Sequence, residues 1–162
     1  MGAITTRLAD YADSQDAAHV VELLDCYARD PMGGGEPLGN HVCDHLVDGL
    51  ASTPGAFSIL AFDDDTAVGL ANCFTGFSTF AARPLVNIHD MVVRDGQRGK
   101  GIGKRLFAAI HEEAEGRNAC KVTLEVLSGN ECAKSLYESQ GYGGYELDPQ
   151  KGHALFWQKK LT

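Results

Sequence analysis

The chain has 162 residues, 44% of them hydrophobic and 22% charged, which is ordinary for one soluble globular domain with a core of its own. We therefore expect a single domain over residues 1–162. The formal net charge of −8 argues against nucleic-acid binding, because phosphate contacts need a basic face. No long apolar run follows Met1, so neither a signal peptide nor membrane association is expected.

Five cysteines are scattered along the chain without a C-x-x-C pair, which argues against a disulfide framework or a zinc ribbon. Reduced thiols are typical of a cytoplasmic protein, and the cytoplasm is the expected location. His41 and His45 stand at metal-ligand spacing, but Val42 replaces the glutamate of H-E-x-x-H. No metal is therefore expected.

The first fifty residues predict a short strand and two helices. Residues 3–8 are typical of a strand. Apolar positions then recur at helical spacing after Asp13 or Ser14, either of which can cap the helix. A loop rich in glycine and proline follows, in which Asp30 and Glu36 either attract an amine or are simply solvated. A second helix is predicted after this loop.

The rest of the chain predicts six more strands and two more helices. A tight acidic turn over residues 63–65 joins two of the strands. Phe74, Phe77 and Phe80 either wall a substrate slot or pack in the core, and packing is expected for two of the three. The later elements are, in order, a strand "LVNIHDMVV", a helix, a strand at 120–127, a helix from Asn130, and a closing pair of strands at 142–147 and 153–161. The expected fold class is α/β, a mixed central sheet of about seven strands flanked by about four helices.

The segment "QRGKGIGKRL", residues 97–106, places a glycine-rich turn between a strand and a helix. Backbone N–H groups and the helix dipole hold phosphate oxygens at such a turn. A P-loop does not fit, because Arg98 and Arg105 stand where its first glycine and its Ser/Thr are required. A dinucleotide fingerprint does not fit either, because Lys104 occupies the place of its third glycine.

The pattern that fits is R-x-x-G-x-G, and at these residues the sequence resembles the GNAT superfamily of acetyl-CoA-dependent N-acetyltransferases. A second segment, "NECAKSLYESQGY", is similar to the superfamily's N-x-x-A-x-x-L-Y-x-x-x-G-[F/Y] motif. The resemblance implies acetyl-CoA as co-substrate, with its pyrophosphate on the turn and its acetyl-pantetheine arm along the strand before it. The implied cofactor-binding residues are Met91, Val92, Val93, Arg98, Gly99, Lys100, Gly101, Ile102, Gly103, Lys104, Asn130, Ala133 and Tyr137.

The same resemblance implies the catalytic residues. It places the phenol of Tyr137 beside the CoA sulfur, where it can protonate the leaving thiolate. The stretch "NIHDMVV" resembles the polyamine and thialysine acetyltransferase branch, whose strand carries an adjacent Glu-Asp pair. His89 and Asp90 take these places and are the candidate bases. Alternation along a strand predicts that they lie on opposite faces, so that one of them faces the substrate.

The function implied is transfer of an acetyl group from acetyl-CoA to a primary amine of a small cationic acceptor by direct attack. A diamine, a polyamine or a lysine-like amino acid leads the list of acceptors. Acetylation of a peptide or protein amine, and a non-catalytic CoA-binding sensor with the same fold, are the alternatives. A homodimer is a further expectation, because dimers are common among such domains.

Overall fold

The structure is a computed structural model that describes residues 2–161. The chain forms two compact units, Met1–Leu124 and Glu125–Thr162. The single domain over residues 1–162 stays a prediction. Among the described residues, no helix is both long enough and apolar enough to cross a membrane.

The first unit is built on one mixed sheet. Its strands run in the order β1-β2-β3-β4-β5, with antiparallel pairing from β1 to β4 and parallel pairing between β4 and β5. Their bounds are β1 Ile4–Leu8, β2 Ala56–Asp63, β3 Thr66–Ser78, β4 Arg83–Val93 and β5 Val122–Leu124. The mixed sheet is confirmed, but the described residues contain five of the seven expected strands.

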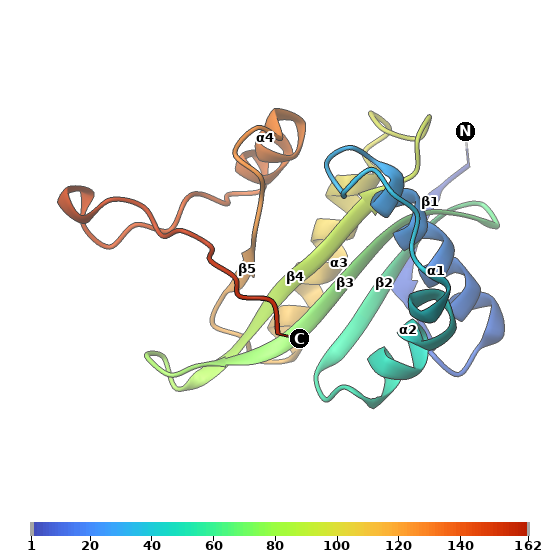
Figure 1. Cartoon of the computed structure of the whole chain (residues 1–162), viewed down its shortest axis with the longest axis horizontal. Helices are drawn as coiled ribbons and strands as arrows, with labels where there is room; N and C mark the ends of the chain where they lie inside the picture. Colours follow the sequence, from blue (N-terminus) through green and yellow to red (C-terminus); the bar gives the residue numbers. More distant parts are fainter. Residues whose placement is uncertain (1, 162) are drawn as a thin grey trace. The chain divides into compact units, whose positions relative to one another are not determined.

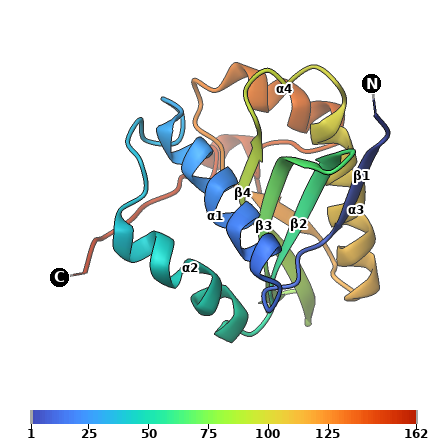
Figure 2. The same ribbon diagram turned by 90° about the vertical axis from the view of Figure 1, so that its right-hand side faces the viewer.

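Three helices cover this sheet: α1 (Ser14–Arg29), α2 (Asn40–Ser52) and α3 (Ile102–Gly116). Figure 2 shows α1 and α2 on one face of the sheet and α3 on the other. The cap of α1 is Asp13, whose side chain accepts hydrogen bonds from the N–H groups of Gln15 and Asp16. Within residues 2–161, these three helices and α4 of the second unit confirm the expected number of four.

The core of the first unit has two layers. Toward α1 and α2, apolar side chains of the sheet pack with Val20, Leu23 and Leu50. On the other face, β3 and α3 pack so closely that a Cβ on Gly69 of β3 would lie 3.0 Å from Cγ2 of Ile102. Five side chains of α3 complete this second layer: Ile102, Leu106, Phe107, Ile110 and Ala114. The sheet is therefore buried on both faces, and polar side chains inside it need partners.

The hairpin of β3 and β4 is longer than the core that supports it. Its pairing extends to Ser78 and Arg83, and Figure 1 shows its tip reaching past the helices of the first unit. Phe74 packs against the core, whereas Phe77 and Phe80 are 63% and 99% exposed. The expectation that two of these three rings pack in the core is wrong, because the tip has no helix beneath it.

The second unit holds α4 (Glu131–Ser139) and a single 3₁₀ turn, Pro149–Lys151. The closing strands expected at 142–147 and 153–161 are not formed, apart from one antiparallel bridge between Glu146 and His153. Paired glycines and Pro149 interrupt the ladder that these segments would need. β5 is likewise shorter than its expected range of 120–127.

Candidate active site

The glycine-rich turn after β4 has the backbone geometry of an anion-binding loop. Gly96, Gly99 and Gly101 have φ angles of +76°, +82° and +81°, a region that side chains with a Cβ rarely adopt. Gly101 caps α3, and within the described chain no side chain hydrogen-bonds to this end of the helix. The first N–H groups of α3 therefore point out of the turn with the positive end of the helix dipole behind them.

Four cations surround this turn: Arg98, Lys100, Lys104 and Arg105. The Arg98 guanidinium donates to the Asp30 carboxylate at 2.8 Å, which links the turn to the loop between α1 and α2. This hydrogen bond is the main cause that lowers the pKa of Asp30. Ile102 and Gly103 begin the helix and are buried. The charge and the geometry of the turn both suit a pyrophosphate.

A β-bulge lies in β4 at the two candidate bases. Asn72 of β3 lies opposite Asp90, whereas the next residue, Cys73, lies opposite Ile88. His89 is therefore the extra residue of the bulge, and the alternation of side chains is interrupted there.

The bulge brings both candidate bases to the same face of the sheet. The His89 ring packs edge-on against Phe74, with ring centroids 5.2 Å apart. Asp90 Oδ2 accepts a hydrogen bond from Asn72 Nδ2 at 3.1 Å. Asn72 and Phe74 are alternate residues of β3 and share the face that α1 and α2 cover. The prediction that His89 and Asp90 lie on opposite faces is wrong, because it assumed a regular strand.

Two residues beside Asp90 were not predicted from the sequence. Asn72 is 2% exposed and holds the carboxylate directly. Tyr27 of α1 is half-buried, and burial followed by the charges of Asp90 and Asp30 raises the pKa of its phenol. A single polar residue within the apolar run "AVGLANCF" was the available signal for Asn72.

The last residues of β4 are not paired with β5. β5 pairs only with Val86, Asn87 and Ile88, and β4 continues to Val93. On the other side, β3 pairs with β4 as far as Val93. The main chain of Met91, Val92 and Val93 therefore has an edge that β5 does not cover.

The remaining predicted residues lie on α4 of the second unit. Asn130 caps this helix, and its side chain accepts a hydrogen bond from the N–H of Ala133 at 3.1 Å. Tyr137 is half-buried, with its ring centroid 6.5 Å from that of Tyr142. The cap role of Asn130 is confirmed, and its contact with CoA stays a prediction. The contribution of Ala133 to cofactor binding and the role of Tyr137 as an acid stay predictions too.

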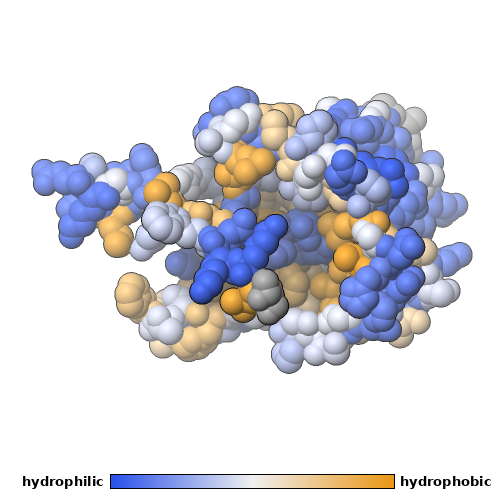
Figure 3. Space-filling view, in the orientation of Figure 1, coloured by the Kyte–Doolittle hydropathy of each residue, from blue (hydrophilic) through white to orange (hydrophobic). Residues whose placement is uncertain are grey.

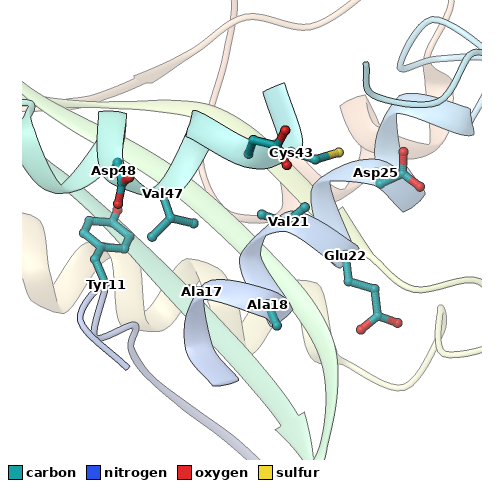
Figure 4. Close-up of a pocket in the computed structure, with 10 residues that line it drawn as sticks. Tyr11, Ala17, Ala18, Val21, Glu22, Asp25, Cys43, Val47 and Asp48 are labelled. Carbon is teal, nitrogen blue, oxygen red and sulfur yellow. The ribbon is translucent and has the colours of Figure 1, made fainter. Parts of the chain in front are cut away.

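A groove of about 580 Å³ lies between α1 and α2 (Figure 4). Tyr11 lies at one end of it, and Val21 and Val47 are among its apolar lining residues. Four carboxylates also line the groove: Glu22, Asp25, Asp44 and Asp48. Figure 3 shows hydrophilic side chains over much of the surface of α1 and α2, with apolar ones between them. Among the described residues, no cluster of three or more His, Cys, Asp or Glu side chains could hold a metal ion.

A mixed sheet in which β4 leads into a glycine-rich turn at the N-terminus of α3 defines an α/β protein suited to a phosphate-bearing ligand. The sequence model of the acetyltransferase (GNAT) family matches residues 20–142. The chain belongs to this family, whose members are acyltransferase enzymes that use acetyl-CoA.

Individual relatives agree with this assignment. The uncharacterized N-acetyltransferase YhfO of Bacillus subtilis (strain 168) is 32% identical over 85 residues. This match spans 52% of the chain and 56% of YhfO, so it covers only about half of that relative.

Solved structures show the same fold. A ribosomal-protein-alanine N-acetyltransferase from Brucella melitensis biovar Abortus 2308 is 22% identical, with a TM-score of 0.66 over 99% of this chain and 98% of that one. An aminoglycoside acetyltransferase from an uncultured soil metagenomic sample, in complex with sisomicin, is 15% identical, with a TM-score of 0.79 over 98% and 97%. At these identities the likeness concerns the fold alone.

Proposed function

We propose that this protein is an N-acetyltransferase that moves an acetyl group from acetyl-CoA to a primary amine of a small cationic acceptor. The observation that carries the proposal is the bulge in β4, which sets His89 and Asp90 side by side on the strand that leads into the glycine turn. β4 thus carries two groups that can take a proton from an amine, and it leads directly into a turn that can hold the phosphates of the donor.

The turn fits the pyrophosphate of acetyl-CoA. A Cβ at Gly99 or Gly101 would meet nothing within 4 Å, so the turn is open on the side where a methyl group would otherwise project. The α3 amides and the cations Arg98, Lys100 and Lys104 would hold the phosphates. The uncovered edge of Met91 to Val93 would hold the acetyl-pantetheine arm by main-chain hydrogen bonds. Acetyl-CoA supplies an activated acyl group to this site.

The acceptor amine must be neutral to attack. His89 or Asp90 takes the proton of the amine, directly or through water, as the nitrogen bonds to the acetyl carbon and the carbon–sulfur bond breaks. Tyr137 gives a proton to the leaving sulfur. Burial raises the pKa of the Cys73 thiol to about 12, so this neighbouring cysteine remains protonated and is a poor nucleophile. This supports direct attack by the amine.

The charge around α1 and α2 supports a cationic acceptor. Four carboxylates line the groove between these helices, and the chain carries a net charge of −8. Glu22 and Asp25 are paired with Arg94 and Arg29, whereas Asp44 and Asp48 form no ion pair among the described residues and carry the negative charge of the groove. Negative potential raises the local concentration of cations and the rate at which they arrive. A diamine, a polyamine or a lysine-like amino acid meets this chemistry and is the proposed acceptor.

The test is incubation with acetyl-CoA and a panel of amines, with free thiol followed over time. The panel holds a diamine, a polyamine, lysine and a peptide with a free N-terminus, beside a reaction without amine. We expect thiol release with one of the first three and a mass gain of one acetyl group on that amine. Release with the peptide alone would favour a peptide or protein acceptor. Binding of acetyl-CoA without release for any amine would favour a CoA-binding sensor and refute the proposal.

A further inference from the structure

A chain of hydrogen-bonded side chains runs through the buried sheet of the first unit and ends on Asp90. The Tyr11 hydroxyl, just before α1, lies 2.8 Å from Ser58 Oγ of β2. Ser58 Oγ donates to Asn72 Oδ1 at 2.6 Å, and Asn72 Nδ2 donates to Asp90 Oδ2 at 3.1 Å. Ser58 lies directly opposite Asn72, and Asn72 directly opposite Asp90, on three adjacent strands. The sheet register itself therefore assembles this chain.

The protons of the chain all point toward Asp90. Ser58 has one hydroxyl proton and gives it to Asn72, so the Tyr11 hydroxyl must donate to Ser58. Burial raises the pKa of Tyr11, which keeps its phenol protonated and able to donate. A reversed Asn72 amide would set its oxygen against the carboxylate oxygen, two acceptors facing each other. The observed arrangement makes Asp90 Oδ2 the acceptor that ends the chain.

Ser58 and Asn72 occupy buried positions of the sheet where an apolar side chain would need no hydrogen-bond partner. Ser58 and Asn72 are 0% and 2% exposed, within strands whose neighbours are apolar. Burial of a polar group without a partner is unfavourable, and a fully paired buried network is what fixes one arrangement. Asp90, at the end of the chain, is partly exposed. Within the described residues its other oxygen, Oδ1, accepts no hydrogen bond and is available to a ligand.

We propose that Asn72, held by Ser58 and Tyr11, is a positioning residue that fixes the Asp90 carboxylate toward the acceptor amine. This inference rests on the proposed function and says which residues would orient Asp90 toward the acceptor amine. One carboxylate oxygen is tied to the sheet, so the other has a defined direction in which to meet an ammonium or amine group. The turn that binds the donor lies outside this network, so acetyl-CoA binding is independent of it.

The test compares Asn72→Leu with a matched control, Leu60→Val. Leu60 is fully buried on β2, two residues from Ser58 on the same face, and outside the network. We expect Asn72→Leu to lower kcat/KM for the amine by about tenfold or more and to change the KM for acetyl-CoA by less than about twofold. Ser58→Ala and Tyr11→Phe should lower kcat/KM for the amine in the same way, with the smaller effect for Tyr11→Phe because it lies further from Asp90. Leu60→Val should change neither constant, although it disturbs the same core.

A second measurement does not depend on activity. The phenol of Tyr11 is half-buried and hydrogen-bonded to Ser58, so its hydroxyl proton should exchange more slowly with water than that of an exposed tyrosine and be visible in the NMR spectrum. We expect this signal in the wild type and in Asp90→Asn, which keeps an acceptor, and its loss in Ser58→Ala. Its absence from the wild type would refute the network whatever the activity.

The outcomes separate the two proposals. If the wild type acetylates an amine but Asn72→Leu behaves as Leu60→Val does, the positioning role is refuted and the proposed function stands. If the wild type acetylates no amine, the proposed function fails and the role of Asp90 toward the amine fails with it. The NMR signal would still report whether the hydrogen-bonded chain exists.

Discussion

Replacement of Asp30 by asparagine should tighten the binding of acetyl-CoA. Arg98 of the glycine turn is paired with Asp30 at 2.8 Å. A pyrophosphate on this turn must compete with the carboxylate for the same guanidinium. Asp30 also accepts a hydrogen bond from the N–H of Met32 through Oδ1, at 2.9 Å. Asparagine keeps an oxygen for Met32 and removes the charge, so the loop retains its turn and Arg98 loses the carboxylate that it contacts most closely, while Asp95 stays 3.4 Å from it.

The magnitude follows from the exposure of the pair. The side chains of Arg98 and Asp30 are 55% and 20% exposed, so solvent screens much of their attraction. Exposed pairs of this kind contribute about 0.2–1 kcal/mol, which corresponds to an affinity gain of about 1.4-fold to 5-fold. The gain should shrink as salt is added, because the ion pair that it removes is screened too.

Asp25→Asn is the matched control. Asp25 of α1 pairs with Arg29 at 2.7 Å and accepts a hydrogen bond from the N–H of Leu38 at 2.8 Å, so it plays the same two roles as Asp30, which caps the C-terminus of this helix. Its arginine lies outside the glycine turn. Calorimetric titration of each variant with acetyl-CoA should show tighter binding for Asp30→Asn alone. Equal affinities, or weaker binding by Asp30→Asn, would refute the competition between Asp30 and the pyrophosphate for Arg98.

Three further predictions concern the proposed acid, the glycine turn and the stability of the first unit. Tyr137→Phe should lower kcat by about 100-fold or more with little change in acetyl-CoA affinity, and equal rates for it and the control Tyr142→Phe would remove the proposed acid. Gly101→Ala and Gly96→Ala should each destabilise the fold by about 1–2 kcal/mol, because both residues have positive φ. Only Gly101→Ala should weaken acetyl-CoA binding in a titration. Asp16→Asn should cost about 1.5–3 kcal/mol at neutral pH in denaturant unfolding, because a bidentate arginine bond from β1 lowers the pKa of Asp16. That contribution is complete above the unfolded pKa, near 3.8, and disappears as the pH falls through the lower folded value.

The sequence predicts the elements of the first unit well because their signals are local. Asp13 caps α1 as one of two expected residues, and the acidic turn at residues 63–65 joins β2 to β3. The glycine turn follows from its own spacing, and its positive φ angles agree with it. Each of these features depends on a few neighbouring residues, so one sequence suffices to find it.

The acceptor side could not be predicted because it depends on register. A bulge in β4 changes which face His89 and Asp90 share, and nothing in "NIHDMVV" marks the extra residue. The partners of Asp90 come from β3, β2 and the segment before α1. Cross-strand pairing brings them together over long sequence separations. The failed closing strands have the same cause, since β-propensity describes the fit to a partner strand that the segment alone does not specify.

The register of β4 explains how one strand can serve two substrates independently. Before the bulge its edge is paired with β5, and after the bulge that edge is released. The bulge is also where the side chains of two consecutive residues turn to the face covered by α1 and α2. The inserted residue, His89, therefore lies where β4 stops pairing with β5, at the edge proposed for the thioester. It also lies where the polar side chains proposed to meet the amine begin. Removal of His89 from the chain should make the pairing of β3 with β4 regular, with Ile88 still opposite Cys73 and Asp90 still opposite Asn72. The deletion should therefore leave the Asp90–Asn72 hydrogen bond in place, and amine turnover should fall no further than in His89→Ala. A folded deletion variant that loses all turnover while His89→Ala retains it would contradict this account of the bulge.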